Sequence, residues 1–198
     1  AGRREFVAAI AGAARAVVLD ADALVAFQGA TDELRRLADG RPLVLTPHPG
    51  EFRTLFPELA AQRELDPWGA AAAAAEQTGA VILLKGVPTV VASTGRAGLT
   101  IASGNPGLAT GGSGDVLSGL IGAALARELE PDIAAALGAQ ALGRGADLAV
   151  RRVSARSLRP MDVVAALPDL WREWELLRES PPPPHPPVLL ELPRPQTL

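Results

Sequence analysis

Cysteine is absent from the 198 residues of this chain, and histidine occurs only twice. The lack of cysteine excludes disulfides, thiolate metal sites and cysteine nucleophiles. The sequence also shows no signal peptide and no apolar run long enough to span a bilayer. These absences predict a cytoplasmic protein.

Neither sign of charge dominates the composition. Nineteen residues are lysine or arginine and 22 are aspartate or glutamate, which gives a formal net charge of −3. Because both signs are interspersed, the sequence has neither the basic footprint of a nucleic-acid binder nor a basic face for a membrane surface. We therefore expect small-molecule partners, with no nucleic acid and no membrane among them.

Lysine is nearly absent as well. Among the 19 basic residues only Lys85 is a lysine, and all the others are arginine. A lone lysine can mark a place that needs a compact ammonium group instead of a planar guanidinium. The alternative is that Lys85 survives by chance at the end of a strand.

Apolar strands alternate with capped helices along the chain. Strands are expected at residues 16–19, 42–46, 80–86, 88–93 and 99–102, with 88–93 antiparallel to 80–86. Helices are expected at residues 3–14, 31–40, 66–79 and 132–150, from Val116 onward, and as a short helix after Pro160. Strands that are apolar throughout and alternate with helices predict an α/β fold with a mostly parallel central sheet flanked by helices.

One globular domain is expected over residues 1–178, since a chain of this length can bury a single core. Residues 179–198 are rich in proline, which cannot donate hydrogen bonds to a helix or a sheet. We expect this segment to be an extended or disordered tail.

A glycine-rich stretch, GNPGLATGGSGDVLSG, covers residues 104–119. Within it, TGGSGD (residues 110–115, the glycine loop) lets backbone N–H groups approach a ligand without obstruction by Cβ atoms. The helix that follows adds unpaired amides and roughly half a positive charge, which together make an anion hole suited to a phosphoryl group. Asp115 would repel that group, but it can accept a proton from a hydroxyl that attacks it. The alternative is that Asp115 is simply the N-cap of the helix.

Four segments resemble known signatures and occur in the same order. GGSGDVLSG resembles the G-x-G-D signature of ribokinase-like kinases, and the others are VLDADAL (18–24), LTPHPGEF (45–52) and LLKGVPTVVA (83–92). Within the ribokinase-like superfamily, the set is similar to the ADP/ATP-dependent NAD(P)H-hydrate dehydratases, the YjeF carboxy-terminal domain type. The matches span about residues 17–125.

The resemblance implies roles for individual residues. Asp115 would be the catalytic base and would contact the substrate together with His48, and Glu51 would hold Mg²⁺, directly or through water. The nucleotide, ADP or ATP, would bind to Lys85, Gly86, Val87, Pro88, Thr89, Asn105, Gly112, Ser113 and Gly114.

His48 and Glu51 also have structural interpretations. Related sugar kinases usually carry asparagine at the position of His48, so the histidine favours a dehydratase. A lone histidine is, however, often a surface or capping residue. Glu51 can complement the dipole of a helix in its first turn, which is compatible with metal binding.

Five further residues have weaker signals. Asp20 and Asp22 follow the first strand, and they either face the cleft or cap the next helix. The tryptophans Trp68, Trp171 and Trp174 are expected to pack within the fold and not to stack on a nucleotide base.

The activity implied by the resemblance is repair of a damaged cofactor. ADP or ATP would phosphorylate the ring hydroxyl of (S)-NADHX or (S)-NADPHX, and elimination of phosphate would regenerate NADH or NADPH. Two other classes remain open. A small-molecule alcohol kinase is disfavoured because such kinases tend to carry T-G-C or A-G-D variants and lack H-P-G-E. An inactive nucleotide-binding remnant is the other.

Domains of this family normally begin with several further β–α units, which this sequence does not show. We therefore expect a ribokinase-like domain without its N-terminal third. The resemblance also implies a homo-oligomer, as a tetramer, and allows fusion to an NAD(P)H-hydrate epimerase domain.

Overall fold

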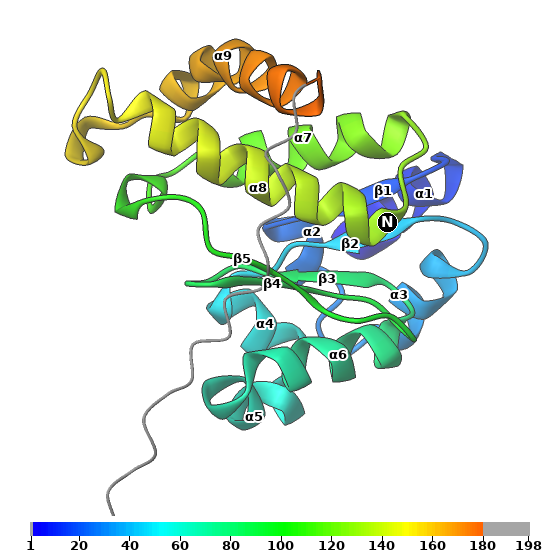
Figure 1. Ribbon diagram of the computed structural model, residues 1–198. Coiled ribbons are helices and arrows are strands. Elements are labelled where there is room, and N and C mark those ends of the chain that lie inside the picture. Colours follow the sequence, from blue (N-terminus) through cyan, green and yellow to red (C-terminus); the bar gives the residue numbers. More distant parts are fainter. Residues whose placement is uncertain (1, 180–198) are drawn as a thin grey trace, which may run out of the picture.

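A computed structural model describes residues 2–179 of the protein and centres on a five-stranded sheet (Figure 1). In sheet order the strands are β1 (Val17–Leu19), β2 (Leu43–Leu45), β3 (Val81–Leu84), β4 (Thr89–Ala92) and β5 (Leu99–Ile101). β1, β2 and β3 are parallel neighbours, whereas β4 pairs antiparallel with both β3 and β5. Within residues 2–179, β4 alone runs against the other strands. The expected α/β fold is confirmed, with a mixed sheet.

Helices cover both faces of this sheet (Figure 1). They are α1 (Arg3–Ala13), α2 (Asp22–Val25), α3 (Thr31–Ala38), α4 (Pro49–Leu55), α5 (Ala60–Leu65), α6 (Pro67–Thr78), α7 (Ser113–Ala126), α8 (Pro131–Ala149) and α9 (Pro160–Glu179), with 3-10 turns η1 (Pro57–Leu59), η2 (Pro106–Leu108) and η3 (Ala155–Ser157). α7 and α8 lie on one face, with α9 packed on α8, and α4 and α6 lie on the other. Within residues 2–179, no helix is long and apolar enough to cross a membrane.

The central strands β2 and β3 are apolar throughout because each contributes to two cores. In β2, Leu43 and Leu45 pack in the cluster that includes the buried alanines of α6, whereas Val44 packs in the cluster formed with α7 and α8. Ile82 and Leu83 of β3 divide between the same two clusters. Successive side chains of a strand point to opposite faces, so a sheet covered on both sides needs apolar residues at every position.

The last helix differs from the sequence prediction. α9 has 20 residues, where a short helix was expected after Pro160. It continues through Pro168, although proline removes one hydrogen-bond donor from a helix. Val163, Ala166 and Leu170 are fully or nearly fully buried along its inner face, and their burial outweighs the lost donor. The predicted tail, 179–198, lies outside the described residues except for Glu179, which ends α9.

Three short helices are absent from the predicted series of elements, although a helix that starts near His48 and Glu51 was an open alternative. α2, α4 and α5 contain four, seven and six residues, respectively. Such segments are too short to show a helical repeat of apolar residues. Two of them, α2 and α4, begin directly after the ends of β1 and β2, and they shape the site described next.

Candidate active site

The candidate site lies at the edge of the sheet where the parallel strands end. Asp20 follows β1, Thr46 follows β2 and Lys85 follows β3. The Thr46 side chain is buried, and both its backbone N–H and its hydroxyl donate to the carbonyl of Leu19, at 3.1 and 3.3 Å. This contact joins the ends of β1 and β2. Ligands of open α/β sheets bind outside this edge, and His48 follows the end of β2 at the same edge.

The second half of the glycine loop forms the first turn of α7. The helix begins at Ser113, not at Val116 as predicted, and its N-cap is Gly112 with φ of +92°. A Cβ atom at position 112 would also lie 3.1 Å from Pro160 Cγ, so both the backbone angle and the contact favour glycine. Asp115 is therefore not the N-cap, which removes the structural alternative stated above.

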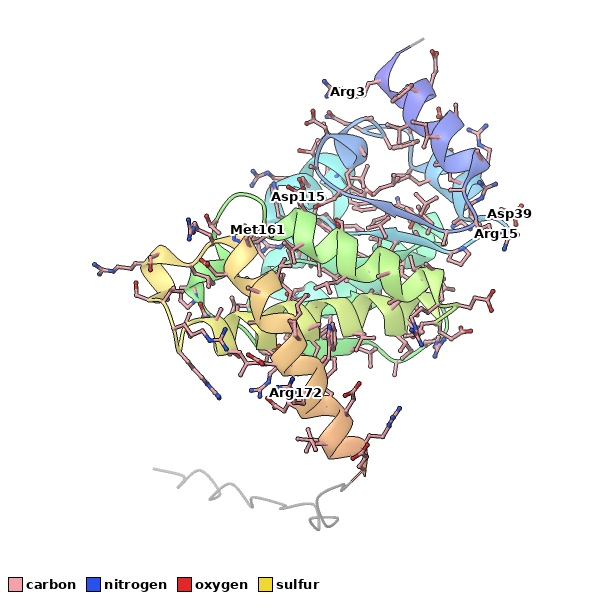
Figure 2. The ribbon with its side chains drawn as sticks, turned by 90° about the horizontal axis from the view of Figure 1, so that it is seen from above. Arg3, Arg15, Asp39, Asp115, Met161 and Arg172 are labelled. Carbon is pink, nitrogen blue, oxygen red and sulfur yellow. The ribbon has the colours of Figure 1, made fainter. Side chains whose placement is uncertain are left out.

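Asp115 is exposed in the first turn of α7 (Figure 2). No hydrogen bond or ion pair joins its carboxylate to another residue in the range 2–179. The labelled Met161, at the start of α9, lies beside it in the view of Figure 2, in keeping with the contact between Gly112 and Pro160. An exposed and unengaged carboxylate at this place is free to receive a proton from a bound hydroxyl.

Ser113 is a second polar group of the glycine loop without a protein partner. Its residue is 7% exposed, and its hydroxyl makes no hydrogen bond within the described part of the chain. Leaving a buried hydroxyl unpaired costs about 1–3 kcal/mol. This unpaired hydroxyl lies in the loop that the sequence predicts to bind an anion.

Lys85 is held in an ion pair with Asp20. Lys85 Nζ lies 2.6 Å from Asp20 Oδ1, and the two side chains are 24% and 17% exposed. The backbone N–H of Lys85 donates to the carbonyl of Pro47 at 2.9 Å, so all three parallel strand ends are linked. A Cβ atom at Gly114 would lie 2.9 Å from Asp20 Oδ2 and 3.5 Å from Lys85 Nζ. The ion pair therefore lies directly against the first turn of α7.

His48 caps α4, as its structural interpretation proposed. His48 Nδ1 accepts from the backbone N–H groups of Gly50 and Glu51, at 2.9 and 3.3 Å, so this nitrogen carries no proton. In return, Glu51 Oε2 accepts from the backbone N–H of His48 at 2.8 Å, which completes a capping box. His48 Nε2 lies 3.3 Å from Glu51 Oε1, and the histidine side chain remains 53% exposed. Capping thus leaves about half of the His48 side chain exposed, although Nε2 lies beside Glu51.

Glu51 fits the limited role expected for a Mg²⁺ ligand. Its side chain is 11% exposed, and both of its oxygens already contact His48. Residues 2–179 contain no group of three or more histidines, cysteines, aspartates or glutamates that could hold a metal ion. Mg²⁺ commonly retains waters and binds through one or two carboxylates and the phosphates of a substrate. The lone pairs left on Glu51 suit that type of site, with contact through water.

Asp22 shares a hollow with His48 and Glu51. The hollow measures about 430 Å³, lies between α2 and α4, and is also lined by Ala21, Val25, Gly50, Arg53 and Thr54. Asp22 is the first residue of α2 and pairs with Arg3 Nη1 at 3.3 Å. The neighbouring Ala21 has φ of +49°, which is uncommon outside glycine. An alanine at this position carries no local signal for such a conformation.

The turn between β3 and β4 contains the predicted nucleotide-binding segment. Thr89 Oγ1 donates to the carbonyl of Gly86 at 3.2 Å, and Thr89 pairs with Ile101 of β5. Val87 is fully exposed and is joined to Pro88 by a cis peptide bond. This turn leaves the same edge of the sheet as Lys85, which brings its start next to the glycine loop.

Asn105 is engaged within the protein. Its Nδ2 donates to Asp147 Oδ1 at 3.2 Å, and its Oδ1 accepts from the backbone N–H of Gly107 at 3.1 Å. Asp147 Oδ2 also accepts from the backbone N–H of Gly104 at 3.2 Å. Asp147 therefore holds the start of the glycine-rich stretch. This role of Asp147 could not be predicted, because a single aspartate in a long helix carries no distinctive sequence pattern.

Two of the three tryptophans pack against each other, whereas Trp68 is exposed, contrary to the prediction that it packs within the fold. Trp171 and Trp174 contact each other in an edge-to-face arrangement with ring centroids 5.1 Å apart. Trp68 Nε1 donates to Thr100 Oγ1 at 2.9 Å.

Comparison with known proteins adds independent evidence. The chain is 44% identical over 158 residues to a bifunctional NAD(P)H-hydrate repair enzyme from Moorella thermoacetica, covering 80% of this chain and 29% of the relative. It is 46% identical over 134 residues to an ADP-dependent (S)-NAD(P)H-hydrate dehydratase from Neisseria meningitidis, covering 67% of this chain and 45% of the relative. The chain thus spans less than half the length of these relatives.

Solved structures of dehydratases and of ribokinase-like proteins also resemble this fold. An ADP/ATP-dependent NAD(P)H-hydrate dehydratase from Bacillus subtilis, co-crystallized with ATP/Mg²⁺ and soaked with CoA, matches with a TM-score of 0.63 and 32% identity, over 68% of this chain and 50% of that chain. A ribokinase-like superfamily protein from Enterococcus faecalis matches with a TM-score of 0.59 and 24% identity, over 86% of this chain and 67% of that chain, which supports the ribokinase-like fold. The family model described as NAD(P)H-hydrate dehydratase matches residues 2–169, and the chain therefore belongs to the NAD(P)H-hydrate dehydratase family.

Proposed function

We propose that this chain takes part in the nucleotide-dependent dehydration of (S)-NADHX and (S)-NADPHX to NADH and NADPH. The observation that carries the proposal is the exposed, unengaged carboxylate of Asp115 in the first turn of α7. It lies in the same loop as a buried hydroxyl without a partner, that of Ser113. The family and the names of the relatives support the reaction class.

The reaction proceeds in two steps. The ring hydroxyl of the hydrate attacks the terminal phosphoryl group of the nucleotide, Asp115 accepts the hydroxyl proton, and AMP or ADP leaves. The lone pair of the ring nitrogen then expels phosphate, and loss of a ring proton restores the double bond of the reduced nicotinamide. No phosphorylated product accumulates, because the phosphate is the leaving group of the second step.

The residues of the chain supply positioning and charge. The amides of the glycine loop stabilise the transferring phosphoryl group, and the side chain of Lys85 lies beside them. His48 presents its Nε2 edge to the hydrated nicotinamide, while its Nδ1 stays fixed by the cap of α4. Mg²⁺, when bound near Glu51, would neutralise charge on the nucleotide phosphates.

Both ADP and ATP are proposed as co-substrates. The relative from Neisseria meningitidis is named ADP-dependent, and the structure from Bacillus subtilis is named ADP/ATP-dependent and was crystallized with ATP/Mg²⁺. The name of the bifunctional relatives supports a second activity in a longer polypeptide, which we propose is an NAD(P)H-hydrate epimerase. The tetrameric state, the cytoplasmic location and the absence of nucleic-acid partners stay predictions.

The decisive experiment is to incubate chemically hydrated NADH with the protein and either ADP or ATP, and to measure recovery of NADH absorbance. We expect one nucleotide to be consumed and one phosphate released for each NADH formed. A stable phosphorylated alcohol with no NADH would support the small-molecule kinase instead. Binding of nucleotide without any turnover, in a polypeptide extended to the length of the relatives, would support the inactive remnant.

A further inference from the structure

Asp20, which the sequence places either facing the cleft or capping the next helix, pairs with Lys85 in the structure. Asp20 lies 65 residues before Lys85 in the chain, yet its Oδ1 is 2.6 Å from Lys85 Nζ. The other carboxylate oxygen, Oδ2, lies 2.9 Å from the position that a Cβ atom of Gly114 would occupy. The carboxylate of Asp20 is therefore in contact with both the lysine and the start of α7.

This place is electrostatically unusual. The start of α7 carries roughly half a positive charge from its unpaired amides, and Lys85 adds a full positive charge beside it. Two positive groups at such close range repel each other unless a negative group lies between or beside them. Asp20 supplies that negative group, and its side chain is only 17% exposed, so water screens the contact poorly.

We propose that Asp20 is a positioning residue, which holds the ammonium group of Lys85 against the first turn of α7 so that it is already placed to contact the phosphates of a nucleoside diphosphate or triphosphate. Lys85 has three N–H donors, and the contact with Asp20 uses one of them, which leaves two for a ligand. The inference rests on the proposed binding of nucleotide at the glycine loop.

The backbone around both residues supports this role. Lys85 is anchored through its own N–H to the carbonyl of Pro47, at 2.9 Å, so the ion pair orients only the side chain. On the other side, Ala21 has φ of +49° directly after Asp20. A non-glycine residue in this region is conformationally costly, and such strain persists only where the surrounding structure enforces it.

Removal of Asp20 should change the affinity for ADP in a direction that distinguishes positioning from a simple charge effect. Removal of a carboxylate from a phosphate-binding site should strengthen anion binding if the carboxylate acts only through its charge. If Asp20 positions Lys85, its removal weakens binding instead. We expect Asp20→Ala and Lys85→Ala each to reduce the affinity for ADP by about tenfold, the scale of one hydrogen bond that involves charged groups. The double variant should bind no more weakly than Lys85→Ala, because the two residues act as one unit.

Two controls separate positioning from general destabilisation. Adenosine lacks phosphate, so its affinity should be the same for the wild type and for Asp20→Ala. Asp39→Ala also removes one carboxylate, but Asp39 is exposed just after α3, at the opposite edge of the sheet, and the variant should bind ADP like the wild type. If Asp20→Ala fails to fold, Asp20→Asn keeps an oxygen that can accept from Lys85 and should lose less than tenfold.

The single lysine of the chain allows a direct test by NMR that needs no turnover. In protein labelled with ¹⁵N-lysine, the side-chain ammonium signal arises from Lys85 alone. We expect this signal to be protected from exchange with water in the wild type, to move to the position of free lysine in Asp20→Ala, and to shift in the wild type when ADP is added.

Two results would overturn the proposal: an unchanged lysine signal in the folded Asp20 variants, or ADP affinity equal to or higher than that of the wild type in Asp20→Ala. Failure of the dehydratase assay alone would contradict the proposed reaction but not this role, because the lysine spectrum and the ADP affinity are measured without hydrated NADH.

Discussion

The strand ends and the first turn of α7 meet at one edge of the sheet, but they use their polar groups differently. At the strand ends, Asp20 pairs with Lys85, and His48 and Glu51 bind each other in a capping box. In the first turn of α7, Asp115 and Ser113 have no hydrogen-bond partner within residues 2–179. The strand ends thus form a preorganised frame, whereas the helix start presents groups that a ligand would satisfy. Substitutions on the two sides should therefore have different effects on stability and activity.

The largest effect is expected from Asp115→Asn. Loss of a general base commonly reduces a rate by about 10²–10⁴-fold. Stability and ADP affinity should change little, because the Asp115 carboxylate makes no hydrogen bond or ion pair within residues 2–179 and the proposed phosphate contacts of the loop are backbone amides. Turnover of hydrated NADH and calorimetric titration with ADP would measure the two properties. Asp32→Asn in the first turn of α3 is the matched control for loss of a charge that complements a helix dipole. Near-normal turnover of the Asp115 variant would refute the assignment of the base.

Gly114→Ala should disturb the boundary between the two regions. The new methyl group would lie 2.9 Å from Asp20 Oδ2, so either the ion pair or the start of α7 has to shift. Overpacking of this kind costs about 1–3 kcal/mol, which denaturant unfolding would measure, and ADP affinity should fall as well. Gly119→Ala lies in the same helix and meets no atom within 4 Å. This control should leave ADP affinity unchanged and raise stability by up to about 1 kcal/mol.

The two functions assigned to His48 can be separated by two substitutions. His48→Ala removes the cap of α4 and should lower the free energy of unfolding by about 0.5–2 kcal/mol. His48→Asn keeps a side-chain oxygen that can cap the helix, so its stability should stay close to that of the wild type. Both variants lose the exposed Nε2 edge and should bind hydrated NADH about 2- to 13-fold more weakly, the equivalent of one neutral hydrogen bond. Equal affinity of the asparagine variant and the wild type would show that His48 only caps.

Ser113→Ala should have the smallest effect on stability. Its hydroxyl is buried without a partner, so removing it should leave stability unchanged or raise it by about 1 kcal/mol. Affinity for ADP should nevertheless fall, because a ligand oxygen would satisfy this hydroxyl in the complex. Thermal unfolding with and without ADP would reveal both changes. A substantial loss of stability without ADP would show that the hydroxyl has a structural partner.

Local patterns in the sequence predicted much of this molecule. Apolar strands, cap residues and glycine stops located the five strands and the long helices except α9. The placement of Asp115 near the start of a helix could also be predicted, because the glycine loop and the helix are adjacent in the chain. Contacts between distant residues could not be predicted in this way. Asp20 and Lys85 are 65 residues apart, and Asn105 and Asp147 are 42 apart, so neither pair leaves a local pattern.

The length of α9 could not be predicted for a related reason. Proline within a helix is a strong local signal for its end, and Pro168 lies eight residues after the start of α9. The helix continues because its inner face packs on α8, which is a tertiary effect that outweighs the local preference. For His48, in contrast, a local interaction decides the structure. Its role as a helix cap was one of the two interpretations of the sequence.

The contact between Gly112 and Pro160 constrains how this protein can diverge. Position 112 needs glycine for its backbone angle, and the proline ring at the start of α9 fills the space that a side chain there would take. A replacement at position 112 would therefore require two changes, one of the turn to remove the positive φ and a small shift of the Pro160 ring. Because the first change alone would already be harmful, evolution is expected to retain this glycine in every lineage that keeps the loop in use, while Pro160 can drift towards smaller residues.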